Sequence, residues 1–144
     1  MSSREQMKPL EGSWTGTETV SEPDGRFEAT ARMSFQTVFD GRFMLCDYVQ
    51  TRPEKQTSVA HGVFRLDERT NAFTVTWFRS PVATATQQTE AVTEDDTLTF
   101  HETVNGKKNR VKYIVGMDKL TVRMEVPTTG GEWKTIFEGA YRRR

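Results

Sequence analysis

Apolar and polar residues alternate along most of this chain with a period of two. The clearest example is the segment from 27 to 35, where apolar side chains stand at every odd position and polar or charged ones between them. Successive side chains of a β-strand point to opposite faces of its sheet, so this alternation predicts a strand with one buried and one solvated face. Outside the first ten residues, no window shows a convincing helical period of 3.6 residues.

Turn-forming residues separate the alternating segments at a spacing of roughly 8 to 14 residues. Asp40-Gly41 and Asn105-Gly106 tolerate the positive φ angles of a tight hairpin, and Asn-Gly is the strongest such signal in the chain. Pro81 ends a strand, because proline cannot donate to a β-ladder. We therefore expect about ten short strands, including a weaker, Thr- and Gln-rich one at 83–92, joined by hairpins.

A row of strands must protect its two edges by closing into a barrel or by splitting into two packed sheets. Sequential hairpins favour closure, since a Greek-key sandwich requires some longer crossovers. The pattern predicts an all-β protein with a single up-and-down antiparallel β-barrel of about ten strands. We expect residues 1–144 to form one domain, with residues 1–9 as a short N-terminal cap over one end.

The Asn105-Gly106 turn also predicts which residues of its two strands face inward. Counting outward from it pairs Glu102 with Asn109 and places Tyr113 opposite Leu98, all in phase with apolar neighbours. Burying a carboxyl group is costly unless it is hydrogen-bonded or protonated, so an inward Glu102 would be a polar anchor inside the barrel. The alternative is a local bulge that turns Glu102 to solvent.

Composition excludes several classes of partner. Lysine and arginine total 20, as do aspartate and glutamate, so the net charge is zero and nothing steers the whole chain toward nucleic acid or an anionic membrane. No segment is apolar over a membrane-spanning length, and the first residues lack the apolar run of a signal peptide. The single Cys46 excludes an internal disulfide and fits a reducing compartment. We expect a cytoplasmic protein with no nucleic-acid or membrane partner.

Catalytic and metal-binding patterns are weak. There is no Gly-x-Ser-x-Gly elbow, and Cys46 has no activating neighbour in the sequence, which favours a structural thiol. His61 and His101 are expected on the outer surface, without cysteine or closely spaced acidic partners. We therefore predict no catalytic residues, no metal site and no cofactor.

The two ends of the chain carry a pattern of their own. Residues 10–16 read Leu-Glu-Gly-Ser-Trp-Thr-Gly, and the chain ends on Tyr141 followed by three arginines. An indole on the first strand supplies a large apolar plug, and an arginine on the last strand can stack on it and donate to nearby carbonyls. Closure of one barrel end is thus assigned to Gly12, Trp14, Tyr141 and Arg142.

With these motifs, the chain resembles the calycin-like barrels, which include lipocalins and fatty-acid-binding proteins, and within them the bacterial family DUF1579. The likeness also rests on residues 40–43 (Asp-Gly-Arg-Phe), 61–67 (His-Gly-Val-Phe-Arg-Leu-Asp) and 73–77, and so covers nearly the whole chain. It implies a barrel but no activity, since members of that family have no established one.

Nitrobindins, a related barrel family, share the opening Leu-x-Gly-x-Trp-x-Gly and bind haem through a histidine near the C-terminus. Residues 134–144 contain no histidine, so that ligand has no counterpart here. A haem-binding alternative would need His61 or His101 on an inward face.

The leading hypothesis is a binder of a small hydrophobic molecule inside the barrel. One alternative is an enzyme that uses the same cavity with an inward carboxylate and histidine. Another is a filled barrel that serves as a homodimeric interaction module. The candidate ligand contacts are Arg32, Tyr48, Trp77, Phe100, Glu102 and Tyr113.

Overall fold

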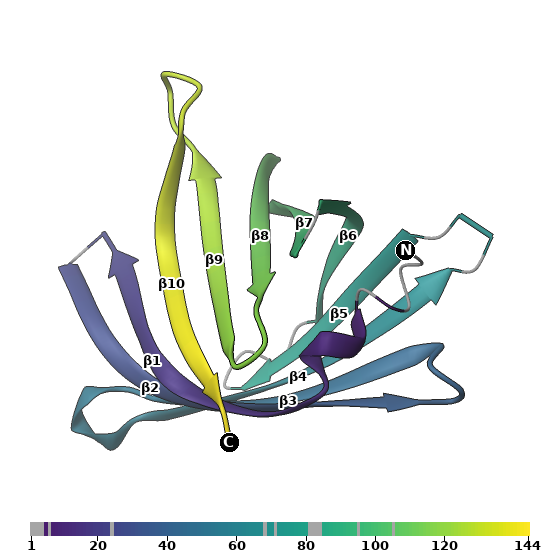
Figure 1. Cartoon of the computed structure of the whole chain (residues 1–144). Helices are drawn as coiled ribbons and strands as arrows, with labels where there is room; N and C mark the ends of the chain where they lie inside the picture. Colours follow the sequence, from purple (N-terminus) through teal and green to yellow (C-terminus); the bar gives the residue numbers. More distant parts are fainter. Residues whose placement is uncertain are drawn as a thin grey trace.

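Ten antiparallel β-strands account for most of the chain in the computed structural model of the protein (Figure 1). The structure describes residues 5, 7–23, 25–67, 69–70, 72–80, 85–94, 96–104 and 106–144, with the backbone alone at 55, 85–94 and 104. The strands are β1 (Gly12–Glu22), β2 (Gly25–Val38), β3 (Phe43–Thr51), β4 (Thr57–Asp67), β5 (Ala72–Ser80), β6 (Ala85–Glu94), β7 (Thr97–Val104), β8 (Lys107–Val115), β9 (Lys119–Pro127) and β10 (Trp133–Arg143). Two short 3-10 helices, η1 (Lys8–Leu10) and η2 (Pro53–Lys55), precede β1 and β4.

The strands form a closed barrel in which each pairs with its neighbours in sequence, and β1 pairs with β10 to complete the ring. Every pairing is antiparallel, and a hairpin or short loop makes each connection, so the predicted up-and-down barrel is confirmed. Because the ring is closed, β1 has no unpaired edge: it pairs with fourteen-residue β2 on one side and with eleven-residue β10 on the other.

The register of the β7–β8 hairpin agrees with the sequence prediction. Glu102 lies opposite Asn109 and Tyr113 opposite Leu98, with Val104 and Lys107 closing the ladder. Gly106 has a φ of 77°, the left-handed conformation that this two-residue turn requires, and Asn105 lies outside the described residues. Glu102 is buried, so no bulge turns it to solvent.

Two strands differ from their expected form. The weak strand predicted at 83–92 is observed as Ala85–Glu94, while residues 81–84 lie outside the described part. In β10, an unbroken two-residue alternation would place Trp133 on the same inward face as Phe137. A β-bulge between Thr135 and Phe137 shifts the register, and Trp133 instead lies outside, with the Arg110 guanidinium 3.9 Å from its ring centre.

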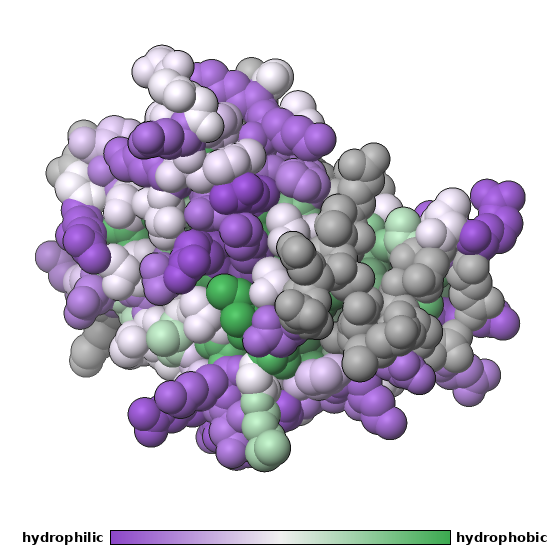
Figure 2. Space-filling view, turned by 45° about the horizontal axis from the view of Figure 1, so that its top comes forward, coloured by the Kyte–Doolittle hydropathy of each residue, from purple (hydrophilic) through white to green (hydrophobic). Residues whose placement is uncertain are grey.

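Inward side chains pack tightly at the end of the barrel that contains η1. Phe64 lies at the centre of this core, with edge-on ring contacts to Phe35, Trp77, Phe100 and Tyr113 at centroid distances of 5.7 to 6.2 Å. The outward faces carry the charged residues, and Figure 2 shows a largely hydrophilic surface with small hydrophobic areas. Neither helical segment in the described part of the chain has the length and apolarity needed to cross a membrane.

The Gly12-Ser13-Trp14 motif closes this packed end. Trp14 is fully buried, and its indole N–H donates to the Leu10 carbonyl oxygen at 2.9 Å. The arginine that covers it is Arg143, whose guanidinium lies 4.2 Å from the ring centre and donates to the carbonyl oxygens of Glu11 (2.5 Å) and Pro9 (2.8 Å). Arg142, which the sequence analysis assigned to this role, is exposed, because it lies on the other face of β10. Tyr141 points inward with the Glu18 cluster described below.

Replacing Arg143 by alanine should therefore destabilise the fold by about 2 to 3 kcal/mol, since carbonyl contacts and a cation–π contact are lost together. Arg142→Ala removes the same charge one residue earlier and should change the free energy of unfolding by less than about 0.5 kcal/mol. Urea denaturation followed by circular dichroism measures both values. Equal losses in the two variants would contradict the assignment of closure to Arg143.

Candidate functional site

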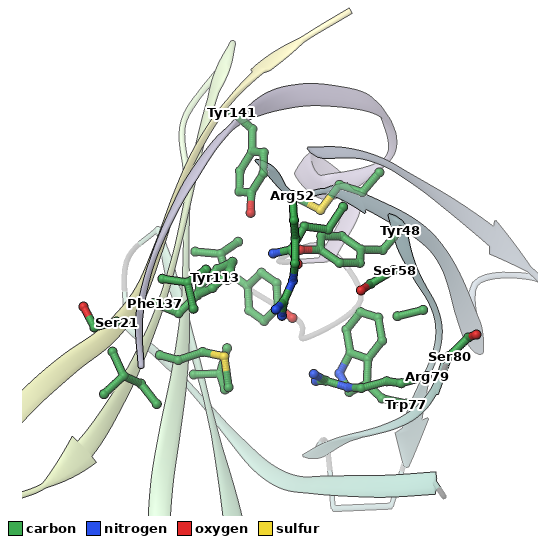
Figure 3. Close-up of a pocket in the computed structure, with 18 of the residues that line it drawn as sticks. Ser21, Tyr48, Arg52, Ser58, Trp77, Arg79, Ser80, Tyr113, Phe137 and Tyr141 are labelled. Carbon is green, nitrogen blue, oxygen red and sulfur yellow. The ribbon is translucent and has the colours of Figure 1, made fainter. Parts of the chain in front are cut away.

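A cavity of about 450 Å³ occupies the barrel interior beyond the packed core (Figure 3). Strands β1 to β5 and β8 to β10 all contribute to its wall. Its inner surface is largely apolar and is formed by Val20, Met33, Phe35, Ala60, Trp77, Val111, Val122, Met124, Ile136 and Phe137, of which the adjacent Ile136 and Phe137 lie at the β10 bulge. The barrel is therefore hollow at this end, with space for a small organic molecule.

A fully buried carboxylate lies beside the cavity. Glu18, on β1, accepts hydrogen bonds from the Tyr48 hydroxyl (2.6 Å) and the Gln50 side-chain amide (2.8 Å) through Oε1, and from the Tyr141 hydroxyl through Oε2. Burying a carboxylate is costly unless its oxygens accept hydrogen bonds, and these three donors provide them. We call these four residues the Glu18 cluster. It ties β1 to its neighbour β10 and, beyond β2, to β3.

The tyrosines that line the cavity are held in their protonated form. Burial first, and then the negative charge of Glu18, raise the pKa of Tyr48 and of Tyr141 far above the ordinary value of 10. Burial likewise raises the pKa of Tyr113. The positive charge of Arg79 acts in the opposite direction on the pKa of Tyr48 and of Tyr113, and burial outweighs it. All three phenols are donors at neutral pH.

Two arginines lie at the mouth of the cavity, and their surroundings differ. The Arg52 Nε–H donates to Gln50 Oε1 at 3.0 Å, its guanidinium is 3.6 Å from the Glu22 carboxylate, and it stacks 4.7 Å from the Phe27 ring centre. Arg79 is exposed at the end of β5 and has no ion-pair or hydrogen-bond partner among the described residues. One cation is thus neutralised within the wall, and the other is not.

Trp77 places an unused donor in the cavity wall. Its side chain is 7% exposed, and its indole Nε1 has no hydrogen-bond partner among the described residues. The ring lies flat over Gly62, its cross-strand neighbour, where an added Cβ would come within 2.7 Å of the indole carbons. Glycine at 62 therefore gives the indole its position.

The structure brings only some of the predicted contacts to the cavity. Tyr48, Trp77 and Tyr113 line it. Phe100 and Glu102 point inward and are buried, but they lie within the packed core and outside the cavity lining. Arg32 is exposed, because it alternates with inward Ala31 and Met33 and so falls on the outer face.

Sequence reasoning missed Glu18, Gln50 and Arg79. A signal existed for each: Glu18 is in phase with Trp14, Gln50 with Met44 and Cys46, and Arg79 with Val75 and Trp77. They were overlooked because a polar or charged residue at an inward position interrupts the apolar pattern by which the strand is recognised.

Neither histidine lines the cavity. The His61 Nδ1 lies 2.8 Å from the Asp47 carboxylate on the exposed face, and His101 is out of phase with inward Phe100. The inward histidine that haem ligation or acid–base catalysis would need is thus not found. Cys46 is fully buried, and burial raises the pKa of its thiol well above 9, so it is unsuited to nucleophilic attack.

Comparison with known proteins identifies the family. Residues 1–143 match the profile of the family described as "Protein of unknown function (DUF1579)". This chain belongs to the DUF1579 family. No curated protein sequence matches it.

Three solved structures show the same fold at low sequence identity. Rv2717c from M. tuberculosis has a TM-score of 0.72 and 14% identity, with 99% of this chain and 97% of that chain covered. The S-type phycobiliprotein lyase CPES from Guillardia theta has a TM-score of 0.68 and 14% identity, covering 100% and 93%. A de novo designed fluorescence-activating β-barrel has a TM-score of 0.50 and 12% identity, covering 95% of each chain. At these identities the likeness establishes the fold alone.

Proposed function

We propose that this DUF1579 protein binds a small, largely apolar molecule inside its barrel. The observation that carries the proposal is the cavity of about 450 Å³, which is enclosed by apolar side chains and reached past a polar mouth. Pockets that bind organic ligands have volumes of roughly 300 to 1,000 Å³ and a similar lining, with few polar groups. The fold is shared with a phycobiliprotein lyase and a designed fluorescence-activating barrel, but the proposal rests on the cavity of this chain.

Affinity would come mainly from apolar burial. Each Å² of ligand surface removed from water contributes roughly 25 cal/mol before the costs of association are subtracted. Most of the cavity wall is held by barrel strands paired on both sides, so it is largely preformed and little ordering is required on binding. Tyr113 and Trp77 then orient the ligand through their donors.

Filling the cavity tests this proposal. Ala60 is half-buried and lines the cavity, so Ala60→Phe should occupy part of the ligand space and weaken binding of a neutral apolar probe, 1-pyrenebutanol, by about tenfold or more, which is 1.4 kcal/mol. Val59, the preceding residue, is 45% exposed on the outer face, and Val59→Phe should leave the affinity within about twofold. Fluorescence titration measures both dissociation constants, and native mass spectrometry gives the stoichiometry.

The proposal fails if the wild-type chain binds no such probe, or if Ala60→Phe and Val59→Phe bind it as the wild type does. Circular dichroism of each variant confirms that the barrel is folded. A second inward substitution, Val122→Phe, repeats the test from the opposite wall of the cavity.

A further inference from the structure

We propose that the ligand is an amphipathic organic acid whose carboxylate is held by the Arg79 guanidinium and the Trp77 indole N–H. This inference rests on the proposed function and names the chemical class of the ligand. Two unused donors on the same strand, two residues apart and on the same face, carry it.

The indole N–H of Trp77 is a buried donor without an acceptor among the described residues. Indole offers a single N–H and no acceptor, and a buried N–H without a partner is less stable than one that is hydrogen-bonded. The ring cannot easily turn to find one elsewhere, because it packs edge-on against Phe64, with centroids 6.0 Å apart, and lies over Gly62. The Nε1 atom is itself covered by neighbouring atoms, so an acceptor atom of a ligand reaches it when the side chains that cover it move aside.

The Arg79 guanidinium lines the cavity and can bind an anionic group of a ligand. Its guanidinium lies 5.9 Å from the Trp77 ring centre, and Figure 3 shows the side chain running alongside the indole toward the interior. Across the strands its row contains Ala60 and Tyr48, neither of which is acidic. In the part of the wall whose side chains are described, Glu22 faces Arg52 and Glu18 holds three donors, so neither carboxylate neutralises Arg79. A planar carboxylate can accept from a guanidinium and from a neighbouring N–H together.

The rest of the cavity fixes the remainder of the ligand. The wall opposite β5 contains the apolar side chains of Val111, Val122 and Met124. Val122 and Met124 come from β9, which contributes no charged side chain to the lining. The ligand is therefore oriented with its acid group at the β5 side of the mouth and its hydrocarbon body inside. A neutral lipid or a dication would leave the Arg79 charge unmatched.

A matched pair of probes tests the inference on the full chain. The probes are 1-pyrenebutyrate and 1-pyrenebutanol, which share one apolar body and differ in the head group. In a buffer of about 0.15 M salt, which screens exposed charges, the wild type should bind the acid about tenfold more tightly than the alcohol. Arg79→Gln should abolish this preference, whereas Arg79→Lys should keep part of it.

Two further variants complete the design. Trp77→Phe keeps an aromatic ring and removes the N–H, and it should weaken binding of the acid by about three- to tenfold. Arg32→Gln removes the same charge from the outer face of β2 and should leave the preference for the acid intact. Circular dichroism confirms that every variant is folded.

The outcomes separate the two proposals. Equal binding of both probes by the wild type, unchanged in Arg79→Gln, would overturn the acid-ligand inference and leave cavity binding in place. An equal loss of preference in Arg32→Gln and Arg79→Gln would also overturn it, since a long-range charge effect would then explain the selectivity. If neither probe binds, both the inference and the proposed function fail.

Discussion

Replacing Glu18 by alanine should destabilise the barrel by about 3 to 5 kcal/mol, the largest single-residue effect that we expect. The substitution leaves the Tyr48 hydroxyl, the Gln50 amide and the Tyr141 hydroxyl without their shared acceptor inside the barrel. It also empties a fully buried site that no neighbour can fill without strand movement, since Glu18 pairs with both Ala29 and Gly139.

Two controls separate the carboxylate from the loss of volume. Glu18→Gln keeps the shape and one acceptor oxygen, so its loss should be smaller, about 1 to 2 kcal/mol. Glu28→Ala removes a carboxylate from an exposed position of β2 and should cost less than about 0.5 kcal/mol. Guanidinium denaturation measures all three. A Glu18→Ala loss as small as that of Glu28→Ala would show that the cluster does not stabilise the barrel.

Alkaline solution should unfold this protein steeply above pH 10. Burial raises the pKa of each of the three tyrosines, Tyr48, Tyr113 and Tyr141, above the value of 10 that it has when unfolded. Between pH 10 and the raised values, the unfolded chain releases three protons that the folded chain keeps. The stabilisation is thus complete below pH 10 and is lost as the pH rises. Each tyrosine lowers the free energy of unfolding by about 1.4 kcal/mol per pH unit, so the three together lower it by roughly 4 kcal/mol per pH unit. Cys46 adds the same effect from about pH 9, because burial raises the pKa of its thiol.

Absorbance of tyrosinate at alkaline pH, recorded together with circular dichroism, measures this effect. Tyrosinate should appear together with loss of the folded signal, whereas the urea-unfolded chain should titrate near pH 10. Tyr113→Phe should reduce the slope of stability against pH by about one quarter, because Tyr113 is one of four groups, the three tyrosines and Cys46, that contribute equally above pH 10. Tyrosinate formation near pH 10 in a chain that stays folded would contradict the buried environment of the phenols.

The matched variants at the packed end address a different property. Arg143 and Arg142 are adjacent, but only Arg143 reaches Trp14, because neighbouring residues of a strand point to opposite faces. A shift of one residue in the register of β10 would have exchanged their roles. The sequence motif therefore identified the type of contact but assigned it to Arg142, whereas the structure has it at Arg143.

The sequence by itself determined the barrel and much of its interior. The alternation assigned Ala29, Ala31, Met33 and Phe35 to the inward face of one strand. The Asn105-Gly106 turn set the pairing of Glu102 with Asn109. Both are local properties, because the strand period and the type of turn act within a few residues.

Only the tertiary structure decided how the site is composed. Tyr141 meets Glu18 across 123 residues of sequence, and the bulge in β10 moves Trp133 outside, and neither follows from a nearby turn. Whether Arg79 or Arg32 faces the cavity depends on the register of each strand, and whether Phe100 lines it depends on how far along the barrel the packed core extends. The physical reason is that closure joins β1 to β10 through hydrogen bonds between distant segments, so their register is set by the packing of the whole barrel.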